Sequence, residues 1–68
     1  MRDVIVEDHG SIIILRLVAR IAREWADQWI PDAPALGPHS ACVERNYADA
    51  ILEGMRDDGL TLGGEYNA

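Results

Sequence analysis

The pattern of hydrophobic and polar positions changes period along the chain, and its first part predicts two β-strands. Val4 to Val6 and Ser11 to Leu17 are aliphatic, largely β-branched runs on either side of Gly10. Such runs, separated by a short segment with glycine, are typical of a hairpin with a loop of about three to five residues. Because Ile12 to Leu15 are continuous rather than alternating, we expect this strand to be covered on both faces, by the protein alone or with a second copy.

From Val18 the apolar positions follow the period of an amphipathic helix. The apolar stripe comprises Val18, Ile21, Ala22, Trp25, Ala26 and Trp29. Trp25 and Trp29 are predicted to be the main core pair against a sheet, with an aromatic ligand cage as the alternative. The helix should end at Ile30, because a residue before proline is pushed out of the α region. No capping side chain precedes Val18, so packing must hold this end of the helix.

A loop and a short strand are predicted before a second helix, and a last strand with a tail is predicted after it. Residues 31–40 contain all three prolines and are predicted to be an extended loop, and Ala41 to Glu44 a short strand. Leu60 to Leu62 is predicted to be the last strand. Residues 63–68 are expected to form a flexible C-terminal tail.

The second helix has signals at both of its ends. Asn46 is predicted to be the N-cap, and Gly59 stands just past the end in the left-handed position, where Leu60 can contact Met55. Gly54 at the margin of the buried stripe allows the close approach of a neighbouring backbone. The stripe itself comprises Tyr47, Ala48, Ile51, Leu52 and Met55.

These elements predict an α+β fold with the order ββαβαβ. The simplest packing is a small two-layer sandwich, in which a four-stranded sheet carries both amphipathic helices on one face. Residues 1–62 would form this single domain. The arrangement leaves one sheet face open, and a partly aliphatic open face is a natural docking place for a partner or a second copy.

Size and composition favour a partner and a cytoplasmic location in a bacterial host cell. A chain of 68 residues builds only a small core, and its single Cys42 excludes an internal disulfide, so association is the expected supplement. The longest aliphatic run, Ile12 to Leu15, is far too short to cross a bilayer, and early acidic residues do not fit a signal peptide. We therefore expect no membrane association.

Acidic residues dominate the second half of the chain. The net charge is -6, with four Arg and five acids in residues 1–31 but two Arg and seven acids in residues 32–68. Such a surface repels phosphate backbones, so direct nucleic-acid binding is disfavoured and a basic protein surface is the expected partner.

Two groups of residues have the composition of reactive sites. Asp8, His9 and Ser11 are the types of a hydrolase relay, but neighbours on an extended chain point to opposite sides, so a hairpin turn is the better interpretation. His39 and Cys42 could be two metal ligands, but a zinc site needs about two more, and a lone cysteine is usually a small buried hydrophobe. We assign no catalytic residue, metal or cofactor.

The second helix also carries a row of carboxylates. Asp49, Glu53 and Asp57 recur every four residues, so they lie about 6 Å apart along the helix axis. One interpretation is a solvated helix face on which neighbouring arginines reduce the repulsion between the carboxylates. The other is a partner-binding row, with Asp58 and Glu44 nearby, that replaces nucleic-acid phosphates in a basic groove. Strand phosphates advance about 3.4 Å, so the row would match roughly every second one.

Four segments resemble a set of short uncharacterised proteins of proteobacterial prophages and mobile elements. They are "HGSIIILRL", "AREWADQWIPDAPALG", "VERNY" and "ILEGMRDDGL", which lie between residues 9 and 60. The chain departs from that pattern at Leu17 to Ala19, where those proteins have Pro-Leu-Thr. The resemblance implies the fold but no activity. At the level of class, a small acidic protein of mobile elements is similar to anti-CRISPR proteins.

The sequence thus predicts a non-enzymatic, acidic interaction protein that inhibits a basic, nucleic-acid-handling host complex, with a CRISPR-Cas complex as a candidate. The carboxylates expected to bind the partner are Glu44, Asp49, Glu53, Asp57 and Asp58. A structural or regulatory homodimer assembled through the sheet is the alternative. A small hydrolase that uses His9 or Cys42 is the third and weakest hypothesis.

Overall fold

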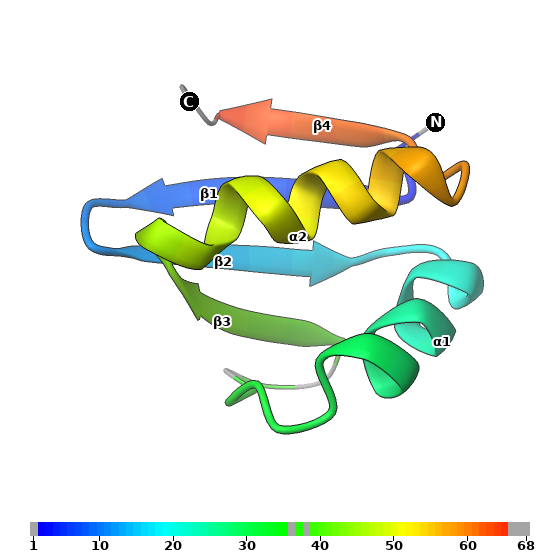
Figure 1. The fold of residues 1–68 in the computed structure, drawn as a ribbon, viewed down its shortest axis with the longest axis horizontal. Helices are drawn as coiled ribbons and strands as arrows, with labels where there is room; N and C mark the ends of the chain where they lie inside the picture. Colours follow the sequence, from blue (N-terminus) through cyan, green and yellow to red (C-terminus); the bar gives the residue numbers. More distant parts are fainter. Residues whose placement is uncertain (1, 36, 38, 66–68) are drawn as a thin grey trace.

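A computed structural model describes residues 2–35, 37 and 39–65. The element order is β1 (Val4–His9), β2 (Ile12–Leu17), α1 (Arg20–Trp29), β3 (Ser40–Glu44), α2 (Arg45–Asp57) and β4 (Leu62–Glu65) (Figure 1). The strands form one sheet in the order β3-β2-β1-β4, in which β4 is parallel to β1 and the other neighbours are antiparallel. The predicted α+β fold with the order ββαβαβ is confirmed.

The core lies between the two helices and one face of the sheet. Every second residue of the central strands faces it, and Val4, Val6, Ile13 and Leu15 are at most 3% exposed. The helices contribute Ala22, Ala26, Ala48, Leu52 and Met55. Two-sided cover of β2 by the chain itself was a wrong prediction, since Ile12 is 38% exposed and Ile14 only partly buried. Cover by a second copy stays a prediction.

The hairpin between β1 and β2 is tighter than its sequence predicts. β1 continues to His9, which pairs with Ile12, so the loop is only Gly10 and Ser11 instead of about three to five residues. Gly10 has a φ of 85°, and its N–H donates to the Asp8 carboxylate at 3.0 Å. This side-chain hydrogen bond and the positive φ together allow the two-residue turn.

Helix α1 begins without a capping side chain, as predicted, although at Arg20 rather than Val18. Ala19 is the N-cap residue and makes no side-chain cap hydrogen bond. The backbone N–H groups of Val18 and Ala19 instead donate to the Asp3 carbonyl at 2.9 and 3.1 Å. Contact with the start of β1 therefore replaces a cap, which a local pattern cannot reveal.

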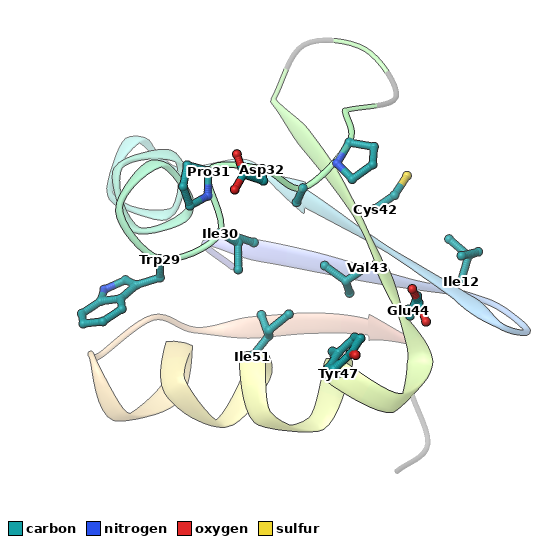
Figure 2. Close-up of a pocket in the computed structure, with 12 residues that line it drawn as sticks. Ile12, Trp29, Ile30, Pro31, Asp32, Cys42, Val43, Glu44, Tyr47 and Ile51 are labelled. Carbon is teal, nitrogen blue, oxygen red and sulfur yellow. The ribbon is translucent and has the colours of Figure 1, made fainter.

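The prediction that two tryptophans form the main core pair was wrong for Trp29, which is 60% exposed. Trp25 is partly buried, and its ring centroid lies 6.5 Å from that of Trp29. The small residues Ala22 and Ala26 make the buried contact of α1, so the helix lies close to the sheet. Trp29 lies in the last turn, where Figure 2 shows its ring on the side of α2.

The two ends of α2 match the prediction differently. Its N-cap is Glu44 rather than Asn46, because β3 leads into the helix with no linker between them. At the other end, Gly59 has a φ of 89°, and the Leu60 N–H donates to the Met55 carbonyl at 2.9 Å. Both Leu60 and Met55 are buried, so the predicted glycine ending with its hydrophobic contact is confirmed.

Strand β4 lies further along the chain than predicted, at Leu62–Glu65 instead of Leu60 to Leu62. The tail prediction was therefore wrong for residues 63–65, and its residues 66–68 lie outside the described part of the chain. Gly64 has a φ of 94° beside β1, and a Cβ there would collide with the Val6 carbonyl oxygen. Only glycine permits this parallel pairing.

We predict that Gly64→Ala destabilises the fold far more than Gly10→Ala. Both positions have positive φ, but a Cβ at Gly10 has nothing within 4 Å. Gly10→Ala should cost about 1–2 kcal/mol of backbone strain, whereas Gly64→Ala adds overpacking and should cost about 3 kcal/mol or more. Urea denaturation of both variants measures the difference. Equal midpoints would contradict the close packing of β4 on β1.

Candidate functional site

The five predicted partner-binding carboxylates divide into a row and two flanking positions. Asp49, Glu53 and Asp57 are exposed on successive turns of α2, so the predicted row exists along one helix. Glu44 is the N-cap residue of that helix and Asp58 its C-cap residue. These two acids therefore lie at opposite ends of α2 rather than in the row.

Asp58 makes a contact within the chain that sequence reasoning missed. Its carboxylate accepts a hydrogen bond from the Trp25 indole N–H at 2.6 Å. The Trp25 ring also lies over Gly54, where a Cβ would be 3.3 Å from the ring. The close approach predicted at Gly54 is therefore to an aromatic side chain rather than to a backbone. These contacts join α1 to the C-terminal half of α2.

A hollow that we call the β3 groove lies between the end of α1, strand β3 and the start of α2 (Figure 2). Its volume is about 620 Å³. A second hollow of about 430 Å³ continues it between the helices and shares Trp29, Ile30 and Ile51 with it. The main apolar side chains of the β3 groove are Ile12, Trp29, Ile30, Val43, Tyr47 and Ile51.

The β3 groove concentrates the exposed apolar surface of the chain. Five large hydrophobic residues are exposed in the described part of the chain. Trp29 and Tyr47 line the helix side of the groove, and Ile12 lines it beyond the edge of β3. Tyr47 is 59% exposed, so its predicted place in the buried stripe of α2 was wrong. Helical periodicity marks a stripe as apolar, but the same stripe can face a core or a groove. The sequence therefore had no signal that separates Tyr47 from its buried neighbours.

Acidic residues supply every charge along both hollows among the residues described. Asp32 and Glu44 line the β3 groove, and Asp57 and Asp58 line its continuation. The carboxylates of α2 thus contribute to two surfaces, since Asp57 belongs both to the row and to this continuation. The arrangement is suited to binding an apolar surface bordered by positive charge.

The open sheet face mixes apolar and paired charged residues. Ile5, Ile14 and Cys42 are partly exposed there. Glu7 forms an ion pair with Arg16 and accepts a hydrogen bond from His9 at 3.1 Å. The Arg16 contact and then the His9 contact lower the pKa of Glu7, and the Glu7 contact raises the pKa of Arg16.

Asp8, His9 and Ser11 do not form a relay. The turn interpretation is correct for Ser11 and for the Asp8 carboxylate, which binds the turn, but Asp8 and His9 themselves belong to β1. The Asp8 carboxylate binds the Gly10 N–H and the Arg45 side chain, whereas His9 turns to Glu7. The Ser11 carbonyl accepts the Arg45 backbone N–H at 2.9 Å. These contacts tie the hairpin to the first residue of α2.

His39 and Cys42 lie in different surroundings. His39 has a φ of 63° and lines a polar hollow of about 440 Å³ with α1 side chains, whereas Cys42 lines the β3 groove. Near His39, the Ser40 hydroxyl donates to the Gly37 carbonyl at 3.3 Å and so helps to hold the loop. Within the ranges the structure describes, no three His, Cys, Asp or Glu side chains are placed to hold a metal ion.

Neither of the two helices in the described residues could span a membrane.

Comparisons with family models, curated proteins and solved structures find no match to this chain. The resemblance to prophage proteins and to anti-CRISPR proteins therefore stays a prediction.

Asp8→Asn should weaken the fold at neutral pH. The hydrogen bond from Arg45, and then that from the Gly10 N–H, lowers the folded-state pKa of Asp8. A lowered pKa means that ionised Asp8 stabilises the fold above about pH 4, and that this stabilisation disappears as the pH falls through the folded-state pKa. Urea midpoints across the acid range should therefore fall less steeply for Asp8→Asn than for the parent chain.

Asp27→Asn is the matched control, since it removes the same charge from an exposed position on α1. It should leave the free energy of unfolding at neutral pH within about 0.5 kcal/mol of the parent value. If the two variants behave alike, Asp8 does not tie the hairpin to α2.

Proposed function

We propose that this chain is a non-enzymatic binding protein of a phage or mobile element that occupies a basic, nucleic-acid-handling surface of a host complex. The observation that carries the proposal is the exposed carboxylate row Asp49, Glu53 and Asp57 on α2. A CRISPR-Cas complex is one candidate for the host partner.

The charge distribution supports a basic partner over an acidic one. The net charge is -6, and the row presents three acids on one side of a single helix. Arg45, which lies at the start of that helix, is bound to Asp8 and to the Gly10 carbonyl at 2.6 Å. These contacts join the start of α2 to the hairpin, and the row lies further along the helix.

Such a row acts mainly through long-range attraction. Carboxylates on a rigid helix attract a surface that normally binds phosphates, and the attraction is screened over about 8 Å at physiological salt. The row would occupy the place of a nucleic-acid backbone without reproducing each phosphate. Inhibition then follows from exclusion of the nucleic acid, with no chemical step in this chain.

Reversal of Asp49 and Glu53 to Arg should abolish capture of the partner. Affinity capture from a bacterial lysate at low and high salt, followed by mass spectrometry, should identify a basic nucleic-acid-handling protein that is released as the salt rises. Glu24→Arg with Asp27→Arg is the matched control, because it changes the net charge equally on exposed positions of α1. A partner held equally by both double variants, or held independently of salt, would refute the role of the row.

A homodimer assembled through the open sheet face is the second candidate, favoured by the partly exposed Ile5, Ile14 and Cys42. Light scattering over a dilution series should then show a dimer that Ile14→Arg converts into a monomer. The paired charges of Glu7 and Arg16 on the same face limit the apolar contact available to such a dimer. A monomer at every concentration would remove this candidate.

A further inference from the structure

We propose that the β3 groove binds a basic amphipathic helix of the partner protein. The inference rests on the proposed function in one respect, namely that the chain acts by binding a basic protein. It adds a second contact surface, distinct from the carboxylate row, and specifies the partner segment that occupies it.

The floor and walls of the groove are suited to apolar side chains. Ile30 and Ile51 are partly buried at its base, beside the buried Val43. Trp29 and Tyr47 stand at its margins with about 60% of each residue exposed. Figure 2 shows Ile30, Val43 and Ile51 reaching from three different parts of the fold towards the same hollow, whereas the Trp29 ring points away from its centre. Exposed aromatic residues around an apolar base are typical of protein-binding hot spots.

Charge decides which apolar ligand the groove can accept. Asp32, Glu44, Asp57 and Asp58 line the two connected hollows, and no Arg or His among the residues described does so. Anionic lipid and nucleic acid are therefore repelled. A second copy of this chain, itself at net charge -6, is also disfavoured. An apolar segment with flanking Lys or Arg satisfies both parts of the surface.

The edge of β3 favours a helix over an added strand. The Cys42 N–H already donates to the Pro34 carbonyl at 2.7 Å, so the loop after α1 occupies part of that edge. In Figure 1, α2 lies in front of β1 and β2, whereas β3 is left without a helix in front of it. A partner helix beside α2 would extend the helical layer over β3, in the common helix-in-groove mode.

A labelled helical peptide tests this directly. The probe has two heptads with Leu on one face and Lys on the other, and its controls replace Lys by Glu or Leu by Ser. We expect the Leu/Lys peptide to bind and to shift the tryptophan emission to the blue, because the exposed Trp29 ring becomes buried. The Leu/Glu and Leu-free peptides should each bind at least about tenfold more weakly.

Two truncations locate the site. Tyr47→Ala and Trp29→Ala should each weaken binding of the Leu/Lys peptide about tenfold. Ile21→Ala is the matched control, since Ile21 is 52% exposed but lies outside both hollows, and it should bind as the parent does. Circular dichroism checks that each variant keeps its fold.

The outcomes separate this inference from the proposed function. If the Leu-free peptide binds as tightly as the Leu/Lys peptide, or if both truncations bind like the parent, the groove is not the site and the inference is overturned. If lysate capture is lost on reversal of Asp49 and Glu53 while the truncations affect neither capture nor peptide, the proposed function stands alone. If the truncations abolish peptide binding and the reversal leaves capture unchanged, the groove stands and the role of the row falls.

Discussion

Among the residues described, the buried side chains of the strands all lie on one face of the sheet, and the rest of the structure follows from that constraint. Side chains of a strand alternate between faces, so Val4, Val6, Ile13 and Leu15 all point to the helices. Two short helices must then cover four strands. α2 crosses from β3 at one edge to β4 at the other, in front of β1 and β2, and α1 lies at one end (Figure 1). The groove begins where the helices leave Val43 open on that face, and it continues round the edge of β3 to Ile12, Cys42 and Glu44, whose side chains lie on the opposite face.

Polar contacts at the ends of the elements support this small core. The Asp3 carboxylate accepts the backbone N–H and the hydroxyl of Thr61 at 2.9 and 3.1 Å, while its carbonyl accepts the N–H groups at the start of α1. Arg45 similarly joins the β1–β2 hairpin to α2. The start of α1 and the residue before β4 are therefore held beside the beginning of β1, and the start of α2 is held at its end. Asp3, Asp8 and Arg45 serve the fold, whereas the row on α2 points outward.

The two acidic surfaces complement one another physically. An exposed row of carboxylates acts at a distance and mainly affects how fast and how selectively a basic partner associates. An apolar groove acts only in contact, and burial of aromatic side chains mainly affects how long the partner stays. A chain of this size has little area for a large interface. Long-range electrostatic attraction together with a few buried apolar contacts is a way for such a small surface to bind a partner. The two surfaces share Asp57 and so adjoin on α2, and the proposed partner would contact both.

The predictable features of this protein are those set by neighbours in the sequence. These features depend on residues a few positions apart, where periodicity and local hydrogen bonds act. They are the hairpin turn, the order of the elements, the uncapped start of α1, the glycine ending of α2 and the carboxylate row. Other features could not be predicted in this way. They are the N-cap at Glu44, the strand at Gly64, the Trp25–Asp58 contact and the exposure of Trp29 and Tyr47. They depend on contacts between distant segments and on the side of each helix that meets the sheet. An apolar stripe looks the same in sequence whether it faces a core or a groove, and only packing in three dimensions separates the two.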